Sequence, residues 1–158
     1  MRQREAQDTR ADYQADDTTI LAQAEAILRR RLERLGNISD PTQASDFLRM
    51  RLGGLEHEQF HVLFLDTRHR VIAIEALARG TVDGAEVHPR EVVKAALTHN
   101  AAAVILAHNH PSGNPEPSAA DRAITARLKQ SLALVDIRVL DHIVVGETCT
   151  SLAARGWV

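Results

Sequence analysis

The chain has 158 residues, of which 44% are hydrophobic and 25% charged, and its formal net charge is −2. This composition is typical of one globular domain with a sizeable core, and it lacks the strong basic excess of a general nucleic-acid binder. A single cysteine, Cys149, excludes an internal disulfide framework and thiolate zinc clusters. The polar N-terminus and the lack of a long apolar run predict a cytoplasmic protein that does not cross a membrane.

The N-terminal region divides into a charged tail and a helix. Residues 1–17 have many charges and no periodicity, so we predict that they are disordered or frayed. From Thr18 to Leu35 apolar residues recur at helical spacing, and Gly36 is a typical helix stop. The opposite side of this helix is basic, which we interpret as a solvated face rather than a phosphate-binding one. Residues 1–39 are therefore predicted to be a tail and helix that precede the main domain, 40–158.

The main domain alternates between helical and extended patterns. Predicted strands are short and rich in β-branched and aromatic residues, at 60–66, 71–78, 101–107, 137–140 and 142–145. A further short extended piece is predicted at 85–87. Predicted helices are bounded by capping, proline or glycine residues, at 40–52, 89–100 and from 118 onward. Strands with helices packed on them indicate an α/β fold, a mixed β-sheet with flanking helices in three layers.

The most informative residues lie between the predicted strand at 101–107 and the helix that follows it. His108 and His110 are two residues apart, and alternate residues of an extended chain point to one side. Ser118 is a typical helix cap, and Asp121 lies on the first helical turn. Two imidazoles and a carboxylate make a three-ligand metal site with a position left for water, as in catalytic zinc sites. Because Ser-x-x-Asp is also a capping pattern, a capped helix without a metal is the alternative.

Residues 108–121 resemble the metal motif of the JAB/MPN (JAMM-type) metallopeptidase superfamily, in which H-x-H-P is followed by S-x-x-D. The finer resemblance is to the bacterial RadC family and extends from about residue 40 to the C-terminus. Further RadC-type segments are Val87–Val92, Val139–Gly146 and Arg155–Trp157. The resemblance implies a JAB/MPN (cytidine-deaminase-like) fold for residues 40–158. It also implies a short form of the family without the N-terminal helix-hairpin-helix region.

The resemblance further implies roles for individual residues. The cofactor would be Zn²⁺, with three protein ligands: His108, His110 and Asp121. A glutamate at the start of an upstream strand would be the general base, and Glu58 matches this position, two residues before an aromatic residue. Glu56 and Glu75 are its competitors. Ser118 would help to hold the oxyanion of a tetrahedral intermediate, a role that is compatible with capping.

Three classes of function follow from these residues. The leading one is a zinc-dependent hydrolase, a metallopeptidase or isopeptidase, in which Glu58 activates a zinc-bound water to cleave a peptide or protein substrate. The first alternative is a DNA-repair-associated nucleic-acid-binding protein or metal-dependent nuclease, although weak DNA binding is expected from the charge. The second is an interaction module with a structural metal. Two histidines and a carboxylate also suit non-haem iron. We expect His142 to be a partly buried, hydrogen-bonded histidine rather than a group that supports the metal ligands or part of a nucleic-acid-binding surface.

Overall fold

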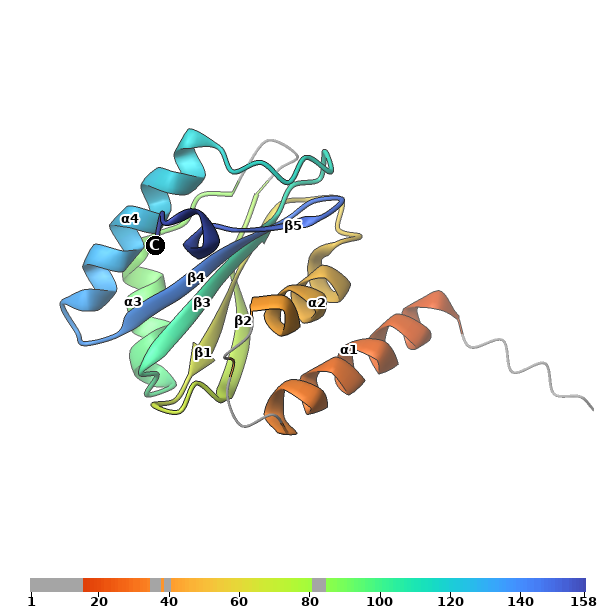
Figure 1. Cartoon of the computed structure of the whole chain (residues 1–158), viewed down its shortest axis with the longest axis horizontal. Coiled ribbons are helices and arrows are strands. Elements are labelled where there is room, and N and C mark those ends of the chain that lie inside the picture. Colours follow the sequence, from red (N-terminus) through yellow and green to blue (C-terminus); the bar gives the residue numbers. More distant parts are fainter. Residues whose placement is uncertain (1–15, 35–37, 39–40, 81–84) are drawn as a thin grey trace, which may run out of the picture.

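The computed structural model describes residues 16–34, 38, 41–80 and 85–158. A mixed five-stranded sheet in the order β2-β1-β3-β4-β5 has helices on both faces (Figure 1). The pair β3 and β4 is parallel, and the other three neighbouring pairs are antiparallel. The predicted α/β fold, with helices on either side of a mixed sheet, is confirmed.

The elements follow one another along the described chain with short connections. The strands are β1 Gln59–Leu65, β2 Val71–Arg79, β3 Ala103–Asn109, β4 Arg138–Val145 and β5 Cys149–Ser151. The helices are α1 Asp17–Arg34, α2 Pro41–Leu52, α3 Pro89–Thr98, α4 Ala119–Ala133 and the 3-10 helix η1 Ala153–Arg155. The central strands β1 and β3 are almost wholly buried, which explains why both read as continuous apolar runs in the sequence.

The alternation of side chains along the central strands builds two separate cores. On one face Leu63 and Leu65 of β1 pack with α2, and on the other Phe60, Val62 and Phe64 pack with α3 and α4. The same alternation divides β3, whose even-numbered residues face α3 and α4. This periodicity determines which residues at the end of β3 face α4.

The structure differs from the sequence prediction at three strands. Strand β3 extends to Asn109 because both neighbouring strands continue to pair with it, Phe60 with His108 and Val145 with Asn109. The two strands predicted on either side of Asp141 are one strand, β4, because Asp141 pairs with Ile105 of β3, and the one-residue register shift falls at Leu140. Strand β5 was not predicted, and the extended piece at 85–87 joins no strand.

The first helix, α1, packs on α2 and keeps much of its surface in solvent (Figure 1). Its arginines Arg29 and Arg30 are exposed, as predicted for a solvated face. The predicted helix stop Gly36, the predicted cap Asp40 and residues 1–15 of the predicted tail lie outside the described residues. The sequence predicts a tail up to residue 17, but Asp17 begins α1, because Asp16 accepts a hydrogen bond from the backbone N–H of Thr19 at the helix start. Among the described helices, none has the length and apolar character needed to cross a bilayer.

Candidate metal centre

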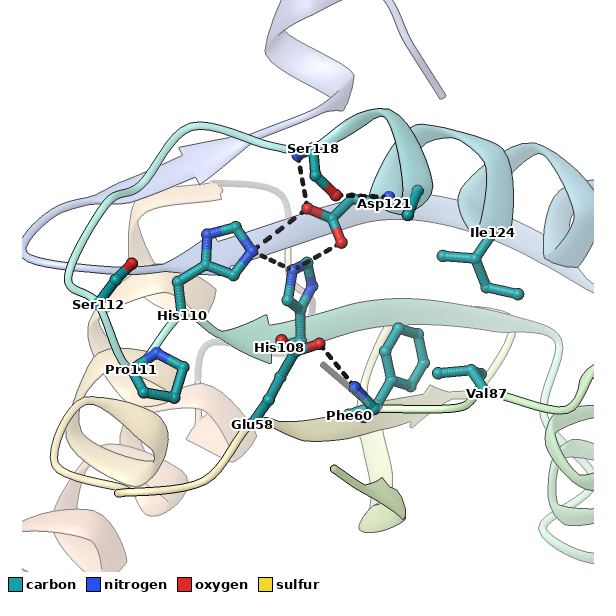
Figure 2. A pocket seen from close by; sticks show the side chains of 12 residues that line it. Glu58, Phe60, Val87, His108, His110, Pro111, Ser112, Ser118, Asp121 and Ile124 are labelled. Carbon is teal, nitrogen blue, oxygen red and sulfur yellow. Dashed lines mark hydrogen bonds and ion pairs between the residues drawn. The ribbon is translucent and has the colours of Figure 1, made fainter. Parts of the chain in front are cut away.

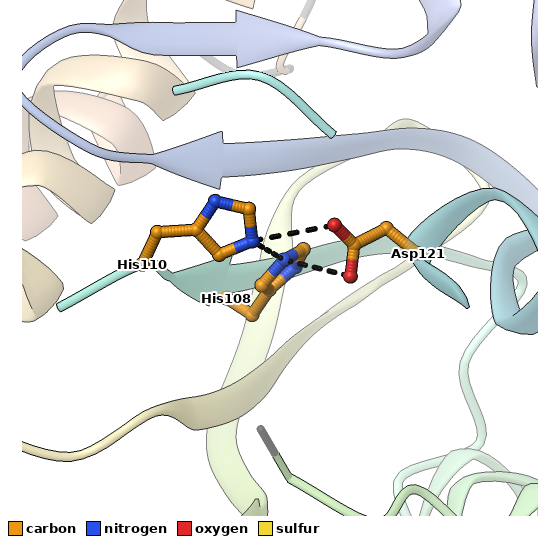
Figure 3. A group of neighbouring side chains, drawn as sticks. All are labelled: His108, His110 and Asp121. Atoms are coloured by element: carbon orange, nitrogen blue, oxygen red, sulfur yellow. Dashed lines mark hydrogen bonds and ion pairs between the residues drawn. The ribbon is translucent and has the colours of Figure 1, made fainter. Parts of the chain in front are cut away.

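Three potential metal ligands converge where the end of β3 meets the start of α4 (Figure 3). The two Nε2 atoms of His108 and His110 are 3.0 Å apart. Asp121 Oδ1 lies 3.1 Å from Nε2 of His108, and Asp121 Oδ2 lies 3.3 Å from Nε2 of His110. The ligand atoms of all three residues lie within 4.8 Å of one another. The structure thus brings together the three residues that the sequence grouped, although their role as ligands remains a prediction.

The helix start holds the carboxylate of Asp121 in place. Ser118 is the N-cap of α4, and its Oγ accepts a hydrogen bond of 3.1 Å from the backbone N–H of Asp121. In return, Asp121 Oδ2 accepts a bond of 2.7 Å from the backbone N–H of Ser118. This is a reciprocal capping box. The capping and metal-ligand interpretations of Ser-x-x-Asp are therefore compatible, because the box orients the carboxylate toward the two histidines.

A chain of buried hydrogen bonds determines the tautomer of His108. The Thr125 hydroxyl donates to the backbone carbonyl of Asp121 over 2.6 Å, so it accepts from Nδ1–H of His142, 2.5 Å away. Nε2 of His142 then accepts from Nδ1–H of His108 over 2.8 Å. We assign these protons from the connected network. His108 is left with an unprotonated Nε2, which is the atom directed at His110 and Asp121.

His110 is oriented in the same way by the loop that follows it. Its Nδ1–H donates to the backbone carbonyl of Asn114 over 2.8 Å, so Nε2 again carries the lone pair. Metal-binding histidines are characteristically held through the second ring nitrogen in this manner. Two nitrogen lone pairs and a carboxylate directed at one point would repel one another, and a bound divalent cation relieves this repulsion. The donor set therefore fits a metal ion.

The charges of the cluster also suit a cation. Burial alone would raise the pKa of Asp121, but when no cation occupies the position and Nε2 of His108 or His110 carries a proton instead, the hydrogen bonds from these rings hold it well below its usual range. The hydrogen bond with Asp121 raises the pKa of His110, against the opposing effect of burial. Burial lowers the pKa of His142 well below its usual value, so this histidine is neutral. Asp121 is thus anionic, and a metal ion would replace the protons that otherwise lie between its carboxylate and the two imidazoles.

A cavity of about 470 Å³ opens beside the cluster (Figure 2). In addition to the three candidate ligands, its polar lining residues are Glu58, Ser112 and Ser118. Its apolar lining residues are Phe60, Ala85, Val87, Pro111, Ala120 and Ile124. A concave site with a few convergent polar groups and an apolar wall is typical of a ligand-binding site.

Of the three glutamates considered in the sequence, only Glu58 lines this cavity. It lies one residue before β1 and points toward the two imidazoles (Figure 2). Its Oε1 accepts a hydrogen bond of 3.3 Å from the backbone N–H of Ala85. Glu56 is exposed outside the cavity, and Glu75 on β2 is hydrogen-bonded to His99. Position thus favours Glu58 over its competitors, and its role as a base stays a prediction.

Asn109, between the two histidines, points to the opposite face of the sheet. Its Oδ1 accepts a bond of 2.8 Å from the backbone N–H of Gln59, and its Nδ2 donates to the carbonyl of His57 over 3.0 Å. These bonds tie both neighbours of Glu58 to the strand that carries the candidate ligands. Local spacing does not reveal this role of Asn109, because its partners are 50 and 52 residues away in the chain.

The loop between His110 and Ser118 is braced by the C-terminal part of the chain. The Gly113 carbonyl accepts a bond of 2.7 Å from the N–H of Glu147. A Cβ atom on Gly146 would lie only 2.4 Å from that carbonyl oxygen, so this turn requires glycine. Arg155 donates to both carboxylate oxygens of Glu116, over 2.6 and 2.9 Å. Two of the RadC-type segments noted in the sequence thus support the loop that carries His110.

These features define the class of protein: an α/β domain with a candidate His-x-His and Asp metal centre at the sheet end. A family model, the RadC-like JAB domain, matches residues 38–157. The chain therefore belongs to the RadC-like JAB domain family, and the predicted JAB/MPN fold is confirmed. Because the match begins at residue 38, the predicted boundary at 39/40 stays a prediction.

Individual relatives agree with this assignment. A UPF0758 protein from Vibrio cholerae serotype O1 is 58% identical over 139 residues, which are 88% of this chain and 88% of that protein. A UPF0758 protein from Xanthomonas campestris pv. campestris is 60% identical over 128 residues. That alignment includes 80% of this chain but 57% of the relative, so the chain spans little more than half of that protein. The names of both relatives state no activity.

Proposed function

We propose that this protein is a zinc-dependent hydrolase of peptide or isopeptide bonds. The observation that carries the proposal is that one cavity contains both a carboxylate, Glu58, and the converging group of His108, His110 and Asp121. A carboxylate beside a three-ligand metal centre is the combination that metal-assisted hydrolysis requires. When bound, zinc acts as a Lewis acid and lowers the pKa of a water molecule to about 7.

The proposed roles follow from the side chains and their partners. The unprotonated Nε2 atoms of the two histidines and the anionic Asp121 would hold the cation. Glu58 accepts a proton from the attacking water and returns it to the leaving amine. The Ser118 hydroxyl lines the same cavity, and among the described residues nothing accepts its hydrogen. It therefore donates to the substrate carbonyl oxygen as negative charge develops there.

The lining of the cavity favours a peptide over a nucleic acid. Among the described residues that line it, the charged side chains outside the histidines are Glu58 and Asp121, and none is Lys or Arg. A phosphodiester substrate carries negative charge and is normally held by cationic side chains. A peptide bond is neutral and needs no such partner. This difference supports the hydrolase over the alternative of a DNA-repair-associated nuclease.

The direct experiment combines metal analysis with an activity screen. Protein loaded with zinc should contain about one zinc ion per chain, and this sample should cleave members of a panel of peptides and isopeptide-linked conjugates. Iron in place of zinc after purification under both metals would contradict the metal assignment. A zinc-loaded protein that cleaves no member of the panel but cleaves DNA would overturn the proposed substrate class.

The DNA alternative has its own measurement. Because the net charge is −2, we expect duplex DNA to bind weakly at about 0.15 M salt, in the range of non-specific binding, 10⁻⁴–10⁻⁶ M or weaker. Fluorescence anisotropy at several salt concentrations measures this. A sub-micromolar affinity that persists at the higher salt concentration would instead favour a nucleic-acid-binding function.

A further inference from the structure

Among the described residues, those on one side of the cavity have apolar side chains. This side is formed by Phe60 of β1, Val87 just before α3, and Ile124 of α4 (Figure 2). Phe60 is buried, whereas Val87 and Ile124 are only half-buried, so their methyl groups are partly open to the cavity. Half-buried aliphatic side chains inside a concave site leave apolar surface in water, which an apolar group of a ligand would cover.

This apolar side lies directly beside the candidate metal ligands. The Phe60 ring stacks on the His108 ring, with a centroid separation of 6.3 Å and an interplanar angle of 14°. Ile124 is three residues after Asp121 on α4, so their side chains are neighbours on one face of the helix. A group held against Phe60 and Ile124 is therefore adjacent to the bond positioned at the metal centre.

The neighbouring residues restrict what this side of the cavity would accept. Ala85 and Ala120 also line the cavity, and their small side chains leave space in it for a ligand. The lining carboxylates, Glu58 and Asp121, point toward the histidines, so no charged side chain of the described residues lines the apolar side (Figure 2). An ammonium or carboxylate group placed there would lose hydration without gaining an ion pair.

We propose that Phe60, Val87 and Ile124 form a subsite for an aliphatic side chain of the residue next to the scissile bond. The substrate class is then a peptide with Val, Leu or Ile at that position. This inference rests on the proposed hydrolase, because the subsite is defined relative to the bond that is cleaved. A hydrophobic pocket discriminates about 10- to 200-fold for each methylene group that it accepts or lacks. Leucine should therefore be favoured over glycine by at least roughly that lower factor.

The test uses probes that bind the metal and carry one side chain each. Acetyl-capped aminoacyl hydroxamates of glycine, leucine, glutamate and lysine are titrated into the zinc-loaded protein by calorimetry. The leucine probe should bind at least about tenfold more tightly than the glycine probe. The glutamate and lysine probes should show no such gain. Because binding is measured, no turnover is needed.

Variants assign the preference to the subsite. Val87→Ser and Ile124→Ser replace methyl groups that face the cavity with a hydroxyl, so both should lower the ratio of leucine to glycine affinity. The matched control is Leu134→Ser at the end of α4, where the side chain is 87% exposed and lies outside the cavity. It should keep the full ratio. Zinc content measured on each variant shows whether the metal centre is intact.

The outcomes separate the two proposals. If the glycine probe binds but the leucine probe binds no more tightly, the subsite is overturned and the metal centre remains. The same conclusion follows if glutamate or lysine is preferred, or if both cavity variants retain the full leucine preference. If the protein takes up no zinc and none of the probes binds, the proposed hydrolase fails, and the subsite fails with it.

Discussion

Two histidines on the central strands, His108 and His61, show what distinguishes a candidate ligand from a structural histidine. Both are buried, but they point to opposite faces of the sheet. His61 has both ring nitrogens engaged: Nδ1 accepts from Arg51 over 3.4 Å, and Nε2 contacts Gln59 Oε1 at 3.1 Å. His108 has Nδ1 engaged with another histidine, and its Nε2 lies among other potential ligands. A buried histidine is thus a candidate ligand when one nitrogen is oriented by the protein and the other is left for a cation.

The same contrast holds for histidines beside carboxylates. His99 lies 2.5 Å from Glu75, closer than either candidate ligand lies to Asp121. Yet no second imidazole joins that pair among the described residues, and the described chain contains one group with three converging ligands. Proximity of a histidine to an acid is therefore weak support for a metal site. Convergence of three ligand atoms is the stronger criterion.

The largest expected effect is on the metal. His110→Ala removes one of three protein ligands, so it should lose most of the bound zinc, measured by elemental analysis after dialysis. His61→Gln, on the other face, should keep its zinc. Zinc binding should also weaken as the pH falls through the histidine range, because a proton on Nε2 competes with the metal. Full zinc retention by His110→Ala would remove this residue from the ligand set.

The next largest effect is expected from Glu58 and concerns the rate of hydrolysis, not the binding of zinc. Glu58→Gln keeps the size of the side chain but cannot accept a proton. It should reduce the rate by roughly 10²–10⁴-fold at unchanged zinc content, as expected for loss of a general base. Glu56→Gln, outside the cavity, is the matched control and should retain the parent rate. Loss of zinc from Glu58→Gln would identify this residue as a ligand instead of a base.

A smaller effect is expected from Asn109. Asn109→Ala leaves the N–H of Gln59 and the carbonyl of His57 without their partner, at a cost of about 1–3 kcal/mol in unfolding free energy. Because these bonds position Glu58, kcat should fall while zinc affinity and KM change less. Asn109→Asp keeps the acceptor for Gln59 and should recover part of kcat. Equal losses of zinc and kcat would show that Asn109 has a general structural role instead.

The smallest expected effect is on the pH dependence of stability and concerns His61, which lies outside the candidate metal centre. Burial, with a further contribution from Arg51, lowers the pKa of His61 to about 4 from its usual 6.5. Between these values the unfolded chain binds a proton that the folded chain does not, so stability falls as the pH is lowered from 6.5 toward 4. His61→Gln should show a weaker loss over this window in chemical denaturation. An unchanged pH profile would mean that His61 does not contribute to it.

Local rules predicted much of the fold and the candidate site. Alternation along an extended chain placed His108 and His110 on one side, and helix capping placed Asp121 on the first turn of α4. Apolar runs located the central strands. The predictions failed at strand ends, because pairing with neighbouring strands determines where a strand ends. Strand β3 continues through Asn109, and β4 passes through Asp141 without a break. The ladder hydrogen bonds that extend these strands come from neighbours that are distant in the sequence.

The sequence by itself determined the family, the order of the elements and the three residues grouped as candidate ligands, because these depend on residue type and spacing within short segments. Only the tertiary structure decided which glutamate shares their cavity, since Glu58 reaches the site through the antiparallel pairing of β1 with β3. It also placed His142 beside His108, across 34 residues of sequence. Contacts of this kind depend on strand order and register, which local spacing does not specify.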